Sequence, residues 1–77
     1  MNGFDQVAGF ATQEIRIRTS PRTGDEIGRL PANVQVRIFA RTQSGAWYRI
    51  ELDGIQGWVY APYMELVNGT VQDLPRE

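Results

Sequence analysis

Four runs of this chain alternate apolar and polar residues with a period of two, and no stretch carries a sustained helical period. The first run is EIRIR at residues 14–18, and the others cover residues 34–41, 47–52 and 57–61. Successive side chains of an extended strand point to opposite faces, so each run predicts a strand with one buried face. A helix needs a repeat near 3.6 residues, so this pattern restricts the chain to an all-β fold.

Turn residues separate these runs. A polar loop with Pro and Gly covers residues 19–26, and a shorter connection covers residues 42–46. Asp53 and Gly54 give the sharpest hairpin signal, because a type I′ turn needs positive φ at both central residues. Short strands at this spacing predict a small barrel of about five antiparallel strands, with one 3₁₀ turn near Pro62–Met64.

One face of the predicted strands collects branched aliphatic residues, and we expect them to form a small core. A chain of 77 residues buries only roughly 60–65% of its unfolded surface. We assign residues 1–8 to an N-terminal tail, residues 9–67 to the domain, and residues 68–77 to a C-terminal tail or linker. The expected core residues are Ile15, Ile17, Ile27, Leu30, Val34, Val36, Ile38, Ile50, Leu52, Val59 and Leu66.

The composition argues against catalysis. The chain has no His and no Cys, which removes the usual general base, the thiolate nucleophile and the commonest metal ligands. Asp25, Glu26, Glu51 and Asp53 fall on loops or outward strand faces, with no apolar pocket implied around them. We therefore expect no enzymatic activity, no cofactor and no metal.

The charge is small and unevenly placed. The net charge is −1, and all eight cations are Arg. Seven of them lie in residues 15–50, which gives weak support to nucleic-acid binding, while the net charge argues against it. No apolar run is long enough to span a membrane, and the N-terminus lacks the basic and apolar parts of a signal peptide.

The aromatic residues fall on the other face of the strands. Trp47, Trp58 and Tyr60 alternate against the core residues Ile50 and Val59, so we expect them to point outward. Exposed aromatic rings bury large areas at a low entropy cost, which suits a peptide or glycan ligand. The alternative is barrel packing, with Trp58 closing one end and Trp47 stacked on an Arg.

The polar loop supplies two further candidates. Arg18 and Arg22 have planar guanidinium groups that fit a carboxylate or a peptide terminus. The alternative is that both are solvated or paired locally with Asp25 and Glu26.

The motifs IRIRTSPRTGDEIGRLPANVQV, GAWYRIEL and GIQGWVYAPYMEL, in this order, resemble the bacterial SH3-like (SH3b) domain family over about residues 9–67. The resemblance implies a five-stranded SH3-like barrel that acts as a non-catalytic module in an extracellular or cell-envelope protein. Its implied ligand is peptidoglycan or another cell-wall peptide or glycan. Arg16 replaces a usual Asn, and residues 19–21 replace a small-Gly-Pro turn.

The same spacing is similar to the peptide groove of eukaryotic Src-homology-3 domains. Trp47 falls on the groove Trp, Tyr60 on the groove Pro and Tyr63 on the groove Tyr, while Pro62 replaces an Asn. The alternatives to wall binding are a protein–protein interaction or spacer domain, with nucleic-acid binding behind them. The candidate ligand-binding residues are Trp47, Trp58, Tyr60, Tyr63, Arg22 and Glu26.

Overall fold

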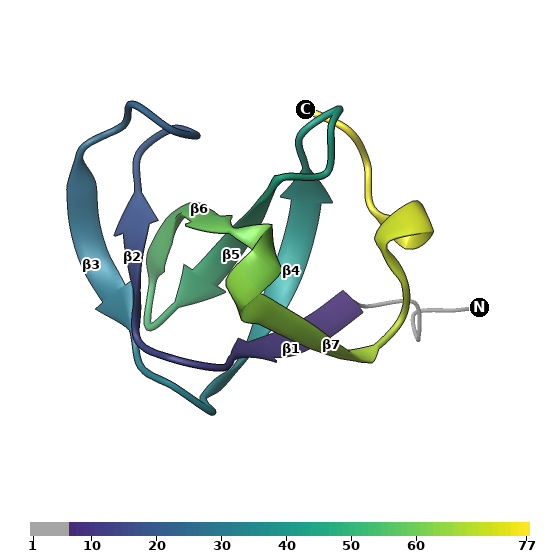
Figure 1. Ribbon diagram of the computed structural model, residues 1–77, viewed down its shortest axis with the longest axis horizontal. Coiled ribbons are helices and arrows are strands. Elements are labelled where there is room, and N and C mark those ends of the chain that lie inside the picture. The colour runs from purple at the N-terminus through teal and green to yellow at the C-terminus, as the bar shows by residue number, and fades with distance from the viewer. Residues whose placement is uncertain (1–6) are drawn as a thin grey trace.

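A computed structural model describes residues 7–77 as seven β-strands and two 3₁₀ turns (Figure 1). Of the predicted tail at residues 1–8, residues 1–6 lie outside the described residues and residues 7 and 8 begin β1. The turns are η2 (Ala61–Tyr63) and η3 (Val71–Asp73). The strands are β1 (Val7–Ala11), β2 (Ile15–Arg18), β3 (Glu26–Leu30), β4 (Gln35–Arg41), β5 (Trp47–Leu52), β6 (Ile55–Tyr60) and β7 (Met64–Asn68).

The strands form one curled sheet in the order β3-β2-β6-β5-β4-β1-β7, with antiparallel neighbours throughout. The end strands β3 and β7 do not pair, so the barrel is open. The expected all-β, SH3-like fold is confirmed. The described part of the chain has two strands more than expected, and η2 begins one residue earlier than the predicted 3₁₀ turn.

The β5–β6 and β4–β5 turns both use residues with positive φ, as their sequences favour. Asp53 and Gly54 have φ values of 50° and 87°, and they join β5 to β6 as the two-residue turn that the sequence predicts. The loop between β4 and β5 uses Gly45 at a φ of 79°. Both hairpins therefore keep the strand parity that the alternation predicts.

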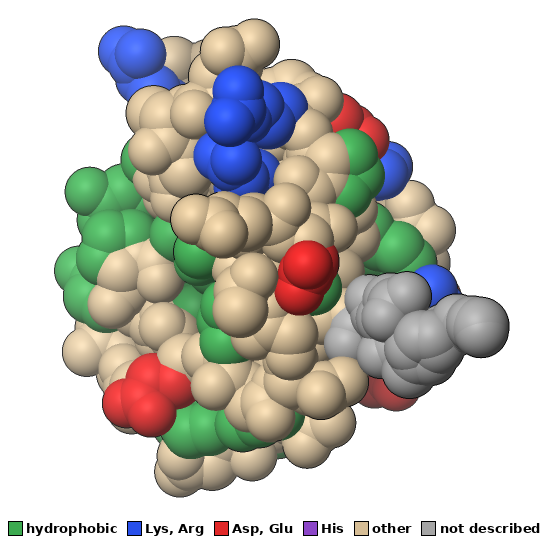
Figure 2. Space-filling model, turned by 90° about the vertical axis from the view of Figure 1, so that its right-hand side faces the viewer, with side chains coloured by type: hydrophobic (Ala, Val, Ile, Leu, Met, Phe, Trp, Pro, Cys, Tyr) green, Lys and Arg blue, Asp and Glu red, His purple; other side chains and the backbone are tan. Residues whose placement is uncertain are grey.

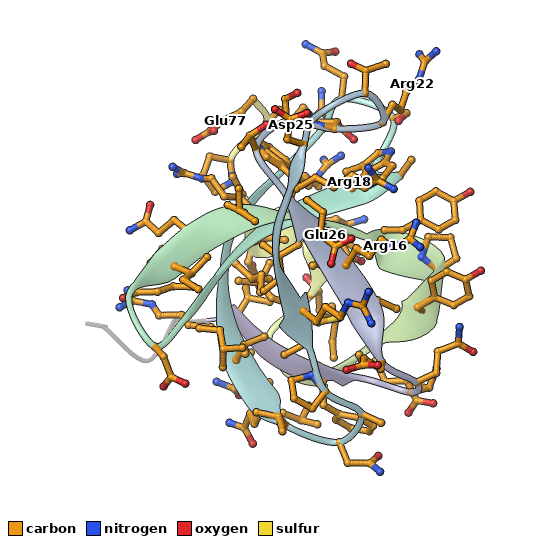
Figure 3. All side chains as sticks on the ribbon, turned by 90° about the vertical axis from the view of Figure 1, so that its left-hand side faces the viewer. Arg16, Arg18, Arg22, Asp25, Glu26 and Glu77 are labelled. Carbon is orange, nitrogen blue, oxygen red and sulfur yellow. The ribbon has the colours of Figure 1, made fainter. Side chains whose placement is uncertain are left out.

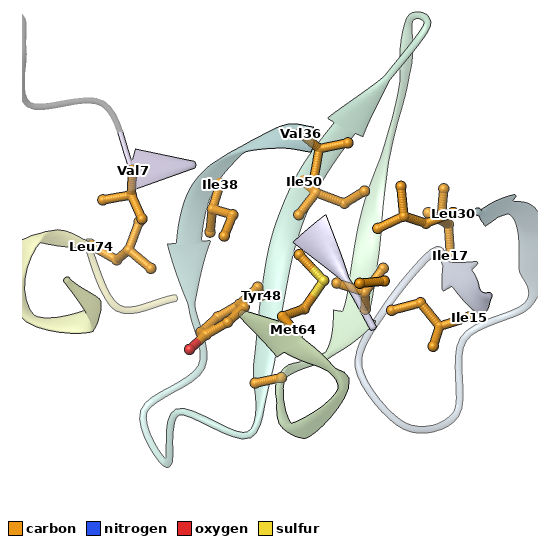
Figure 4. Packing of buried hydrophobic residues seen from close by; sticks show 13 residues of the cluster. Val7, Ile15, Ile17, Leu30, Val36, Ile38, Tyr48, Ile50, Met64 and Leu74 are labelled. Carbon is orange, nitrogen blue, oxygen red and sulfur yellow. The ribbon is translucent and has the colours of Figure 1, made fainter. Parts of the chain in front are cut away.

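The buried residues form one cluster between the curled halves of the sheet (Figure 4). Ile17, Leu30, Ile50 and Val59 are the largest fully buried side chains. The predicted core residues that are buried are Ile15, Ile17, Leu30, Val36, Ile38, Ile50 and Val59, with Leu52 and Leu66 partly buried against them. Strand parity thus predicts most of the core.

The prediction of a core position is wrong for two residues. Ile27 is 40% exposed because the register shifts beside it, so it is the extra residue of a bulge in the edge strand β3. Val34 is 37% exposed because it lies in the turn before β4 and not in the strand. The buried residues missing from the predicted list are Val7, Ala11, Ala40, Tyr48, Ala61, Met64 and Leu74.

The end of the chain packs against the sheet. Leu74 is 6% exposed and lies beside Val7 in the core (Figure 4). The Arg41 amide donates to the Pro75 carbonyl at 3.0 Å, and the Glu77 amide donates to the Arg41 carbonyl at 2.8 Å. The predicted domain limits at residues 9 and 67 stay predictions, and residues 74–77 make these contacts with β4 beyond the second limit.

Strand β2 of the β2–β3 hairpin approaches β6 closely at Gly57. Arg18 of β2 and Trp58 of β6 are the only residues of these two strands that lie directly opposite each other as ladder partners. A Cβ added to Gly57 would lie 2.5 Å from Cγ2 of Ile17 and 2.7 Å from the Arg18 carbonyl oxygen, so only glycine fits there. This contact holds the outer face of β2 beside the outer face of β6.

We expect Ile50→Ala to lower the free energy of unfolding by about 2–5 kcal/mol, because it leaves a cavity in the closed core. Ile27→Ala removes the same atoms from a half-exposed site and should cost roughly 1 kcal/mol or less. Denaturant unfolding of both variants and of the wild type measures the difference. Equal losses for the two variants would contradict the assignment of the core.

Candidate functional site

A groove of about 610 Å³ lies on the outer face of β2, opposite the end of β6. Its volume is within the range of ligand sites in proteins. One wall is aromatic and the other carries arginines. The lining residues are Gln13, Glu14, Ile15, Arg16, Arg18, Arg22, Arg29, Trp47, Tyr60 and Tyr63.

Three rings make the aromatic wall. Trp47 and Tyr60 are registered partners on β5 and β6, with ring centroids 5.2 Å apart at 61°. Tyr63, from the end of η2, contacts Tyr60 at 5.7 Å in the same edge-on manner. Tyr60 and Tyr63 remain 41% and 40% exposed. Edge-to-face contacts fix the rings against one another and leave ring surface open to a ligand.

The backbone at Tyr63 is held from the start of the β2 hairpin. The Thr12 amide donates to the Tyr63 carbonyl at 2.8 Å, and the Thr12 hydroxyl donates to the same oxygen at 3.2 Å. These bonds place residues 12–14 beside Tyr63, so Glu14 marks this end of the groove.

The opposite wall comes from alternation in β2. Because Ile15 and Ile17 point into the core, Arg16 and Arg18 point outward. Arg22 extends from the loop above them (Figure 3). The register of the hairpin puts Arg29 of β3 directly opposite Arg16.

Two of the four groove arginines are neutralised by glutamates. Arg29 Nε donates to Glu26 Oε2 at 2.9 Å, and Arg16 Nε lies 3.3 Å from Glu26 Oε1. Arg29 also lies 3.9 Å from Glu14. The hydrogen bond from Arg29 is the main cause that lowers the pKa of Glu26. Desolvation opposes it, and the charges of Arg29, Arg16 and Arg18 each lower the pKa further.

Arg18 and Arg22 have no such partner. Arg18 donates from Nη1 to the Gly24 carbonyl at 3.0 Å, which ties the loop to β2. Within residues 7–77 neither guanidinium forms an ion pair. Asp25 follows in the same loop, and its backbone amide and carbonyl bond to Thr19. The groove therefore keeps two cations that are free to meet an anion.

The structure brings four of the six predicted site residues together, namely Trp47, Tyr60, Tyr63 and Arg22. Trp58 and Glu26 do not line the groove. Trp58 lies on the outer face of β6, half-buried between Arg18 and Arg49 in the strand register. Glu26 is the ion-pair partner of Arg16 and Arg29. Their role as ligand residues stays a prediction.

The sequence reasoning missed other lining residues, among them Glu14, Arg16 and Arg29. The run EIRIR carried a signal for the first two, because its polar positions share the face opposite Ile15 and Ile17. Arg29 had no local signal. It reaches the groove through the register of the β2–β3 hairpin, which the residues of β3 alone do not specify.

The family model of the bacterial SH3 domain matches residues 14–65, more than half of the chain. The chain belongs to the bacterial SH3 domain family. The match covers all the groove residues except Gln13. Domains of this family are generally non-catalytic binding modules for peptides or protein partners, often in secreted or envelope proteins. No curated protein matches this bacterial SH3 domain significantly.

Two further findings concern the described residues 7–77 of this bacterial SH3 domain. None of its helical segments there has the length and apolar character needed to cross a membrane. The same residues contain no group of three or more His, Cys, Asp or Glu side chains placed to hold a metal ion. The groove is therefore the feature on which we base a function.

We expect the Glu26 carboxyl to titrate below its usual pKa of 4.5, and Arg29→Gln to raise that pKa again by removing its principal hydrogen bond. A lowered folded pKa means that the pair stabilises the fold above the unfolded pKa, and that this contribution is lost as the pH falls through the folded pKa. Carboxyl-carbon NMR titration measures both values. Arg37→Gln serves as the control, and an unchanged pKa in Arg29→Gln would contradict the assignment.

Proposed function

We propose that this domain is a targeting module that docks a larger extracellular or cell-envelope protein onto peptidoglycan, by taking a cell-wall peptide into the groove. The observation that carries the proposal is the groove itself, with an aromatic wall of Trp47, Tyr60 and Tyr63 facing a row of arginines. Membership of the bacterial SH3 domain family supports it, because such domains are often related to the cell wall.

The physical argument rests on what three exposed rings can do. Each ring offers a large apolar surface with little entropy to lose, while its polar edge can still bond to backbone groups of a ligand. An extended peptide places alternate side chains on one face, so it can lay them between the rings. The groove is open, which suits a chain that continues beyond the contact at both ends.

A protein partner is the second candidate, and the edge of the sheet favours it. Strand β3 ends the sheet, so its outer edge pairs with no other strand of residues 7–77. Such an edge can accept a strand from a partner. Ile27 on this strand and Ile55 on β6 are both exposed. The Ile27 side chain lies beside Gly57 and the Ile55 side chain lies beside Gly28. Binding there would leave the aromatic groove unused.

Nucleic-acid binding has less support. Arg16, Arg29 and Arg49 are each paired with a glutamate. On the side of the molecule shown in Figure 2, several basic side chains gather near the top, and acidic side chains lie in separate places on the same face. Affinity for nucleic acid would fall steeply with added salt, while binding led by aromatic contacts would not. A salt series therefore separates the two.

We expect Trp47→Ala to weaken the binding of the purified domain to isolated peptidoglycan roughly thirtyfold, the loss of about 2 kcal/mol typical of an aromatic hot spot. A co-sedimentation titration measures the affinity, with the fold of each variant checked by circular dichroism. Phe39→Ala is the matched control, because Phe39 stacks under Arg37 at 4.8 Å and does not line the groove.

Trp58→Ala in the same assay tests whether the site extends beyond the groove lining. If folded Trp47→Ala binds as well as the wild type, the groove does not hold the wall ligand. Retained wall binding together with a loss in an Ile27→Asp variant would instead favour the edge of β3.

A further inference from the structure

The two ends of the groove differ in charge. Glu14 lies at the end beside Tyr63, which the Thr12–Tyr63 hydrogen bonds bring close to the start of β2. Arg18 lies four residues further along the strand, a distance of about 13 Å in extended backbone. Arg22 projects from the loop at that far end (Figure 3). The groove therefore has an acidic residue at one end and, at the other end, two arginines that form no ion pair among the described residues.

The ion pairs decide which charges remain available. The side chains of Arg16 and Arg29 share Glu26, and Arg29 approaches Glu14 as well. Arg18 uses one N–H on the neutral carbonyl of Gly24, and Arg22 forms no hydrogen bond or ion pair within residues 7–77. A guanidinium has five N–H donors, so both keep most of their donors for a ligand.

We propose that the groove selects its peptide by a carboxylate, held by Arg18 and Arg22, while the adjoining ligand residues pack on Trp47, Tyr60 and Tyr63. This proposal rests on the proposed function, in which the groove is the peptide site. It adds the class of ligand, a peptide with a carboxylate. Guanidinium and carboxylate form paired, charge-assisted hydrogen bonds that a neutral amide cannot replace. The binding energy for this one group therefore discriminates acidic from amidated peptides.

The placement of the glutamates favours a carboxylate on a peptide over an extended anion. A phosphate polymer laid along the groove would bring negative charge against Glu14 at the other end, where like charges repel. A peptide with one carboxylate meets the two arginines and leaves its uncharged part beside Glu14. The same arrangement accommodates an amino group of the ligand at the Glu14 end.

The test compares peptides that differ in a single group. Acetyl-Gly-Ala-Ala-Ala with a free C-terminal carboxylate is titrated into the folded domain, beside the same peptide with a C-terminal amide. A third peptide, acetyl-Ala-Glu-Ala-Ala-amide, places the carboxylate on a side chain and distinguishes the two sources. The indole N–H of Trp47 and the Nε–H of the arginines, followed by NMR, report binding at the groove.

We expect the amide to bind about tenfold more weakly than one or both acidic peptides. Arg22→Gln should remove that preference, because Arg22 has no structural bond to lose. Arg18→Gln should do the same, although it also frees Gly24 from its bond to the strand. Arg37→Gln, an arginine outside the groove, is the matched control and should keep the wild-type preference.

Several outcomes would overturn the proposal. They are equal binding of acid and amide by the wild type, a preference that survives in Arg22→Gln, no binding of any of the peptides, or tighter binding of inorganic phosphate than of the acidic peptides. The wall-binding assay is separate from this test. A domain that prefers the acid but does not sediment with peptidoglycan would refute wall targeting alone, and the reverse result would refute carboxylate selection alone.

Discussion

The close approach of β2 to β6 at Gly57 is the contact on which the rest of the molecule depends. It joins the β2–β3 hairpin to the β4–β6 strands through a single registered pair, Arg18 with Trp58. There is no room for a Cβ at position 57, because Ile17 and the Arg18 carbonyl already fill the space. Any larger residue there must push the hairpin outward, which would open the core around Ile17 and move the arginine row away from Tyr60.

The core and the groove are two faces of the same strands. In β2 the residues Ile15 and Ile17 are buried while Arg16 and Arg18 face the groove. In β6 the buried Val59 alternates with Tyr60 on the aromatic wall. Strand parity therefore positions the groove residues with no extra structure, and the outer residues can be changed with little effect on the core.

The sequence pattern predicts correctly which side chains are buried where this depends on strand alternation and on local turns. It fails where burial depends on the register between paired strands. Alternation predicts Ile17, Ile50 and Val59 as core, since each lies inside a regular strand. It fails for Ile27, because a bulge is a property of the paired strands and not of one run of residues. The number of strands was underestimated for a similar reason, as β1 and β7 form by pairing with each other across more than fifty residues.

The same distinction applies to the site. The side chains of Trp58 and Tyr60 are both predicted to point outward, yet only Tyr60 lines the groove, because the strand register places Trp58 between Arg18 and Arg49. Glu26 was predicted to touch a ligand, and its contacts in the structure are to Arg16 and Arg29. Exposed ion pairs contribute little to stability, so the consequence of this one is electrostatic. By neutralising Arg16 and Arg29 at one end of the arginine row, it confines the free positive charge to Arg18 and Arg22 at the other end, which is the charge distribution behind the carboxylate site that we propose.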